Sequence, residues 1–191
     1  MKLLHRHPAG FNPETPWAQE SESIRQDSRL FRQIVAQRRS PHTGREHSFY
    51  RLQGPDWVNV VAFTRSNELL VVEQFRHGID HSTLEIPGGG CDPGEAPAEA
   101  ARRELREETG FVSGQWVALG SCTPNPATQN NRCHTFLALD PAEELQVWAC
   151  PWPEWQACMR HGEIHHALVL SAFQLLSLWE GWPDLVRRLE L

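Results

Sequence analysis

The chain has 191 residues, of which 40% are apolar and 22% charged, and its formal net charge is −6. This length favours one domain with a short extension, and the composition is that of a globular protein rather than of a disordered segment. A negative net charge supplies no general attraction to nucleic acid or to an anionic membrane, so neither is expected as a partner.

The five cysteines are irregularly spaced and form no CxxC pair, so we expect neither a zinc ribbon nor a disulfide framework. The N-terminal residues MKLLHRHPAGF lack the long apolar region of a signal peptide. The apolar stretch at 167–179 is interrupted by polar residues and is too short to cross a bilayer. We therefore expect a cytoplasmic protein with reduced thiols.

The N-terminal part of the chain gives mixed signals. Residues 1–22 contain three prolines and many polar residues and predict an irregular arm, whereas residues 23–39 show no clear period. Residues 40–47 form a turn-rich link. Runs rich in β-branched and aromatic residues then predict three strands and one hairpin turn, at 48–52, 56–64 and 67–75 with the turn at 65–67.

The remainder alternates between strand and helix patterns after a Gly/Pro-rich stretch at 82–94. Residues Ala96 to Thr109 predict a helix, with Pro97 in its first turn and Gly110 just past its end. Further strands are expected at 115–122, 132–139 and 145–149, and further helices at 153–160, 164–179 and 183–190. The order of strands, helix, strands and helices favours an α+β fold or an α/β/α sandwich.

The helix at 96–109 carries an unusual acidic edge. Glu104 and Glu108 lie within about 40° of each other around a helix, and Glu107 lies on the other side of Glu104 within about 60°. Like charges at this spacing repel, so they require ion pairs with arginine or a divalent cation such as Mg²⁺ or Mn²⁺. A solvated acidic face is the alternative, but a glycine-rich loop runs directly into this helix and exposes backbone groups that approach metal or phosphate.

Residues 89–111 also match a nine-position pattern. Gly89 is followed after five residues by Glu95, then after seven by Arg103-Glu104-Leu105, Glu107-Glu108 and Gly110-Phe111. This pattern resembles the Nudix box, and all seven fixed and both apolar positions agree. The resemblance implies an α/β/α sandwich with a mixed sheet, in which the box forms a loop, a helix and a second loop.

The Nudix resemblance also implies a reaction, namely hydrolysis of a nucleoside diphosphate linked to another group, with Mg²⁺ or Mn²⁺. In this chain Glu104 and Glu108 resemble the main metal ligands, and Glu107 a third ligand or the catalytic base. The carbonyl of Gly88 resembles the backbone ligand, and the pair Glu95 and Arg103 resembles the groups that orient the carboxylates.

Residues 56–90 resemble the branch of ADP-ribose pyrophosphatases and nucleoside diphosphate sugar hydrolases. That resemblance places Gln74, Arg76 and Glu85 near the substrate, with Arg76 contacting the diphosphate; a surface ion pair of Arg76 with Glu73 or Glu85 is the alternative. Pro126 stands sixteen residues after Gly110, as in ADP-ribose hydrolases, although an ordinary loop proline is the competing interpretation. Arg132, which follows this proline in the chain, is a further candidate substrate contact.

In this branch the catalytic base often comes from a late loop. Glu143 and Glu144 are the candidates, with Glu154 and Glu163 as competitors. The histidines at 161, 165 and 166 are expected at an exposed helix start rather than around a metal.

The expected organisation is an N-terminal arm and β extension over 1–55, which forms a homodimer in relatives of this branch, and a hydrolase domain over 56–191. The expected substrate is ADP-ribose or a related nucleoside diphosphate sugar. Hydrolysis of GDP-mannose or another nucleotide sugar, and a non-catalytic sensor, are the alternatives.

Overall fold

The computed structural model describes residues 16–28, 30–140, 142–143 and 149–189. The chain divides into two compact units, Met1–Gly54 and Pro55–Leu191, and each is described by itself. The division expected from the sequence placed the boundary after residue 55.

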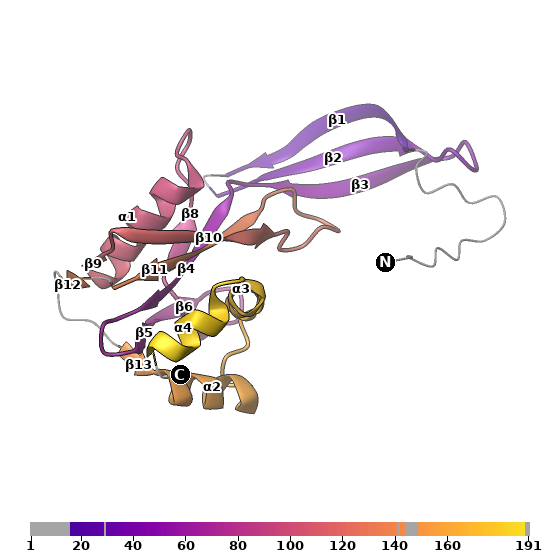
Figure 1. Cartoon of the computed structure of the whole chain (residues 1–191). Helices are drawn as coiled ribbons and strands as arrows, with labels where there is room; N and C mark the ends of the chain where they lie inside the picture. Colours follow the sequence, from indigo (N-terminus) through magenta and orange to yellow (C-terminus); the bar gives the residue numbers. More distant parts are fainter. Residues whose placement is uncertain (1–15, 29, 141, 144–148, 190–191) are drawn as a thin grey trace. The chain divides into compact units, whose positions relative to one another are not determined.

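The first unit is a three-stranded antiparallel sheet, drawn in indigo and purple in Figure 1. Its strands are β1 (Ala18–Asp27), β2 (Arg32–Arg39) and β3 (Glu46–Gln53), in that order. The predicted irregular arm is wrong for residues 18–22, which belong to β1, whereas residues 1–15 lie outside the described part. Strand β1 escaped prediction because it is exposed along its whole length, so no hydrophobic alternation marks it. Pairing with β2 holds it instead, helped by ion pairs such as Arg39 Nε to Glu20 at 2.8 Å.

The second unit is built on a mixed sheet. The strands β10 (Gln115–Cys122), β11 (Cys133–Leu139), β4 (Trp57–Phe63), β5 (Glu68–Leu70) and β13 (Ala149–Pro151) follow one another in this spatial order. Strand β11 runs parallel to β4, while the other pairs are antiparallel, so the mixed sheet expected from the sequence is confirmed. The predicted turn at 65–67 joins β4 to β5.

Two short strand pairs complete the β structure of the second unit. Strands β6 (Val72–Arg76) and β7 (His81–Glu85) form an antiparallel hairpin, and β9 (Phe111–Val112) pairs with β12 (Ala142–Glu143). The single strand predicted at 67–75 is therefore wrong, because the chain leaves β5 at Val71 and enters the hairpin. The strand predicted at 145–149 falls mostly outside the described residues, and β13 begins at its last residue.

Four helices cover the sheet on both faces (Figure 1). They are α1 (Pro97–Thr109), α2 (Trp152–His161), α3 (Ala167–Leu178) and α4 (Trp182–Leu189), within three residues of the predicted ranges. Alternate residues of β4 face opposite sides: Val58, Val60 and Ala62 pack with Leu105 of α1. Val61 and Phe63 pack with Trp155 of α2 and Val169 of α3. The predicted α/β/α sandwich is thus confirmed.

The ends of α1 are fixed locally. Pro97 occupies the first turn, and the N–H of Ala96 is bound by the Glu99 carboxylate at 3.4 Å. The helix ends at Gly110, whose φ of 70° suits glycine and whose N–H donates to Arg106 O at 2.8 Å. Among the residues that the structure describes, no helix has both the length and the apolar character needed to cross a membrane.

The packing of the sheet against α2, α3 and α4 generates a stability prediction. Leu137 in β11 is fully buried in this core, so Leu137→Ala removes buried methyl groups and leaves a cavity. We expect the free energy of unfolding, measured by urea titration, to fall by about 2–5 kcal/mol. The control Leu178→Ala truncates a leucine that is 71% exposed, and its effect should stay within about 0.5 kcal/mol. Equal effects of the two substitutions would contradict this core.

Candidate active site

The glycine loop and the acidic helix approach each other unusually closely. Strand β8 (Gly88–Gly90) pairs antiparallel with β4, with Gly88 opposite Asn59 and Gly90 opposite Trp57. A Cβ on Gly88 would overlap the carbonyl oxygen of Val58, and a Cβ on Gly89 would overlap the carboxylate of Glu104. The absence of side chains therefore allows the backbone of β8 to lie against the acidic edge of α1. This strand was missed from the sequence because glycine carries no strand pattern.

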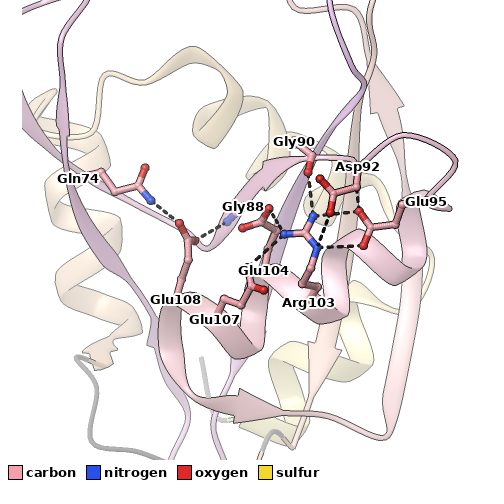
Figure 2. Close-up of polar contacts among 9 residues, drawn as sticks. All are labelled: Gln74, Gly88, Gly90, Asp92, Glu95, Arg103, Glu104, Glu107 and Glu108. Carbon is pink, nitrogen blue, oxygen red and sulfur yellow. Dashed lines mark hydrogen bonds and ion pairs between the residues drawn. The ribbon is translucent and has the colours of Figure 1, made fainter. Parts of the chain in front are cut away.

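Arg103 lies at the centre of the site, and Figure 2 shows its contacts. A guanidinium has five N–H donors, and here all five are used. Nε and one Nη2 proton bind both carboxylate oxygens of Glu95, at 3.0 and 2.9 Å. Nη1 donates to Glu104 at 2.7 Å and to Glu107 at 3.2 Å, and Nη2 also donates to the carbonyl of Gly90 at 2.9 Å. One cation thus joins the loop to three carboxylates.

Glu95 is fixed from a second side as well. Its Oε2 accepts the backbone N–H of Asp92 at 2.9 Å, which closes the turn before α1. The hydrogen bonds from Arg103 and from this N–H hold the pKa of Glu95 below its ordinary value. The hydrogen bonds that Arg103 donates to Glu95, Glu104 and Glu107 raise the pKa of Arg103, so the guanidinium stays charged. The orienting pair expected from the sequence is formed in the structure.

Glu108 has a different environment from its acidic neighbours. Its Oε2 accepts the backbone N–H of Gly88 at 2.9 Å, and its Oε1 accepts from the side-chain amide of Gln74 (Figure 2). Burial raises the pKa of Glu108, and the nearby charge of Glu104 adds to this effect. The two hydrogen bonds and the more distant Arg76 only partly oppose it. A positive charge placed between Glu104 and Glu108 would remove this penalty.

The donor set suits a hard divalent cation. The acidic edge and β8 offer carboxylate and carbonyl oxygens, the ligand type that Mg²⁺ and Mn²⁺ prefer. Among the described residues, no three His, Cys, Asp or Glu side chains are yet gathered around one point. Both oxygens of Glu108 accept from protein donors, so binding a cation requires Glu108 to exchange a partner, whereas Arg103 engages Oε1 of Glu104.

The β6–β7 hairpin contributes an ion pair between half-exposed Arg76 and buried Glu85 beside the glycine loop. Arg76 Nε and Nη2 each bind one carboxylate oxygen of Glu85, both at 2.7 Å. Glu85 is only 3% exposed and also accepts from the hydroxyl of Thr83. Burial works to raise the pKa of Glu85, but the hydrogen bonds from Arg76 and Thr83 and the neighbouring His166 hold the pKa below its ordinary value. The structure therefore contains the ion pair between Arg76 and Glu85 that the sequence offered as an alternative.

This ion pair faces a hollow of about 320 Å³ that adjoins the glycine loop. Arg76, Glu85 and the three glycines line it, with Trp57 and Asn59 from β4 and His166 from the start of α3. Reasoning from the sequence missed Asn59 and His166. The sequence feature that could have indicated Asn59 is a single amide within the apolar run WVNVVAF. In the structure its Nδ2 donates to Leu168 O at 2.9 Å.

A second hollow of about 510 Å³ lies on the outer side of α1. Arg102, Arg106 and Trp116 line it, and Arg103 and Glu107 reach it from the acidic edge. The guanidinium carbon of Arg102 lies 5.3 Å from the centre of the Trp116 ring, a cation–π arrangement. The glycine loop thus lines the first hollow, and Glu107 of the acidic edge lines the second.

The remaining predicted site residues lie elsewhere or outside the described part. Pro126 is exposed in a turn between β10 and β11, and Arg132 binds the hydroxyl of Ser121 at 2.6 Å; neither lines the first hollow. Glu143 pairs through its backbone with Phe111. Glu144 lies outside the described residues.

Comparison with known proteins matches this unit to the model of the NUDIX domain over residues 55–176. An ADP-ribose pyrophosphatase of Bacillus subtilis is 29% identical over 138 residues, covering 66% of this chain and 75% of the relative. A methanol dehydrogenase activator of Bacillus methanolicus is 38% identical over the same coverage. A crystal structure of an ADP compounds hydrolase superposes with a TM-score of 0.76 at 22% identity, covering 86% of this chain and 94% of that one.

The lowered pKa of Glu85 generates a prediction on pH and stability. A carboxylate whose pKa is lower in the folded state adds stability above its unfolded pKa of about 4.3, and this stability is lost as the pH falls through the folded pKa. We expect Glu85→Gln to unfold more easily than the wild type at pH 7, and the difference to shrink as the pH falls below about 4. Urea unfolding at a series of pH values measures it. A difference that stays constant or grows on acidification would contradict the charged Arg76–Glu85 pair.

Proposed function

Because the chain belongs to the Nudix family, we propose that this Nudix hydrolase cleaves the diphosphate bond of ADP-ribose or a related nucleoside diphosphate sugar. The products are a nucleoside monophosphate and a sugar phosphate. One observation carries the proposal: Arg103 joins the carboxylates of Glu104 and Glu107 to the carbonyl of Gly90, on the helix edge that also presents Glu108.

The residues that would hold divalent cations are Glu104, Glu107 and Glu108, together with the carbonyl of Gly88. The bound cations supply neutralisation of the diphosphate and a lower pKa for attacking water. Glu95 and Arg103 keep the carboxylates in place, because all five N–H donors of Arg103 are engaged by the three carboxylates and the carbonyl of Gly90. The raised pKa of Glu108 supports a cation at this position, since a cation would stabilise its charged form.

The two hollows support a substrate with a group on either side of a diphosphate. Arg76 uses Nε and Nη2 on Glu85, and in the described part of the chain no hydrogen bond uses Nη1, which leaves it for a phosphate oxygen. Gln74 binds Glu108 from the same hairpin, so the diphosphate contact and the acidic edge are coupled. On the other side of α1, the hollow lined by Arg102 and Trp116 offers room and positive charge.

Glu107 is the candidate base that the geometry favours among the described residues. Its side chain is 60% exposed, and among the described residues only Arg103 donates a hydrogen bond to it, so it can reach a water molecule. Glu143 and Glu144 stay competing predictions for the base. The homodimer and the cytoplasmic location also stay predictions.

ADP-ribose is the proposed substrate because a Bacillus subtilis relative is an ADP-ribose pyrophosphatase, and Pro126 agrees with that preference. GDP-mannose or another nucleotide sugar is the second candidate. A sensor without activity is disfavoured, because binding alone has no need of the complete set of Arg103 and three glutamates.

The test is turnover with Mg²⁺ of ADP-ribose, GDP-mannose, UDP-glucose, NADH and diadenosine polyphosphates. We expect ADP-ribose to give the highest kcat/KM. Glu108→Gln should lower kcat by orders of magnitude, because it removes a charged oxygen from the cation site. The matched control is Glu99→Gln, which alters an exposed glutamate in the first turn of α1 and should leave kcat unchanged.

Two outcomes would contradict the proposal. Binding of one compound without turnover of any would support a sensor. An unchanged kcat in Glu108→Gln would remove the cation from this edge of α1.

A further inference from the structure

His166 is a partly buried imidazole at the hollow beside the glycine loop. It directly precedes α3, at a helix start as expected from the sequence, and its side chain is 30% exposed. Its Nε2 lies 3.8 Å from Oε2 of Glu85. Its Nδ1 is buried and has no hydrogen-bond partner among the described residues. A buried nitrogen without a partner is costly, so the position of this ring calls for a reason.

We propose that His166 is a positioning residue for the Arg76–Glu85 pair, and that through Glu85 it sets the direction in which Arg76 presents its remaining N–H groups to an anionic phosphate. This inference rests on the proposed function, because it assigns the hollow to the diphosphate of the substrate.

The first step of the argument concerns Glu85. Its Oε1 accepts from Arg76 Nε and from Thr83, so this oxygen is held on two sides. Its Oε2 accepts from Arg76 Nη2, and the imidazole of His166 lies beside the same oxygen. Without the imidazole N–H, Oε2 loses this polar neighbour, and the carboxylate gains freedom to tilt.

The second step concerns Arg76. Because two parallel hydrogen bonds join its guanidinium to Glu85, the two groups share a plane, and a tilt of the carboxylate turns the guanidinium with it. Its side chain is 42% exposed, so the protein supplies few other restraints on the side facing the hollow. A guanidinium that turns loses part of its hydrogen bonding to a phosphate held at the glycine loop.

The third step concerns the anchoring of His166 itself. Asn59 in β4 donates to Leu168 O at 2.9 Å, and the carbonyl of His166 accepts the N–H of Leu170 at 3.1 Å. The start of α3 is therefore tied to the central sheet, and the imidazole is held in place by its backbone. Burial lowers the pKa of His166 despite the nearby Glu85, so at neutral pH the ring acts through the Nε2–H that faces Glu85 rather than through a positive charge.

The test is a double-mutant cycle on the binding of α,β-methylene ADP-ribose, an analogue that resists hydrolysis, measured by calorimetry with Mg²⁺ present. His166→Ala should weaken Kd about tenfold, which lies within the coupling energies found for residues of one ion-pair network. In the Arg76→Ala background the same change should weaken Kd less than about twofold, since His166 acts through Arg76.

Matched variants separate the effect of the N–H at the Nε2 position of His166 from the effect of the size of its ring. His166→Gln, whose Nε2 reaches the position of the imidazole Nε2, should bind within about threefold of wild type. His166→Phe keeps the ring without a nitrogen and should show the loss of His166→Ala; it replaces His166→Ala in the cycle if that variant does not fold. His165→Ala removes the neighbouring exposed imidazole and should bind as wild type.

Unchanged binding by His166→Ala, wild-type binding by His166→Phe, or equal losses in the wild-type and Arg76→Ala backgrounds would each overturn the inference. Absence of analogue binding by the wild type would overturn it too. Coupled losses in a protein that binds the analogue yet hydrolyses no ADP-ribose would support the role of His166 and refute the proposed function. Turnover of ADP-ribose together with an additive double-mutant cycle would support the proposed function and refute the role of His166.

Discussion

The hydrogen bonding of Arg103 is the constraint on which the site depends. Glu104 and Glu107 lie on one edge of α1, and Glu95 precedes the helix, so without a cation between them their charges would repel. The five N–H donors of Arg103 bind all three carboxylates and the carbonyl of Gly90. This single side chain therefore holds the glycine loop close to the acidic edge. The lack of a Cβ at Gly89 leaves room for this close approach.

Two carboxylates of the second unit, buried Glu85 and half-buried Glu108, have opposite environments. The pKa of Glu85 is lowered because burial is outweighed by Arg76 and Thr83, so this carboxylate is satisfied within the protein. The pKa of Glu108 is raised because burial and Glu104 outweigh two hydrogen bonds from Gly88 and Gln74. Glu85 thus serves to orient a cationic side chain, whereas the environment of Glu108 favours an additional positive charge.

The elements that could be predicted from the sequence are those whose signals lie in neighbouring residues. Helix α1 begins and ends where Pro97 and Gly110 indicate, and the apolar alternation of β4 matches its two-sided burial. Strand β1 was missed because its stability comes from pairing with β2, and β8 because glycines carry no propensity for a strand. The partners of Glu108 could not be predicted either, since Gln74 lies 34 positions away in the sequence and only the fold brings the two together. The position of His166 beside Glu85 depends in the same way on the tie between α3 and β4.

Anomalous X-ray scattering from crystals soaked with Mn²⁺ and a non-hydrolysable nucleoside diphosphate sugar tests the central claim most directly. The predicted result is Mn²⁺ between the carboxylates of Glu104 and Glu108 and the carbonyl of Gly88, with Arg103 still bound to Glu95 and the diphosphate touching the metal. The claim would be contradicted if Glu108 kept its bonds to Gly88 and Gln74, and Glu104 its bond to Arg103, while metal and diphosphate bound elsewhere.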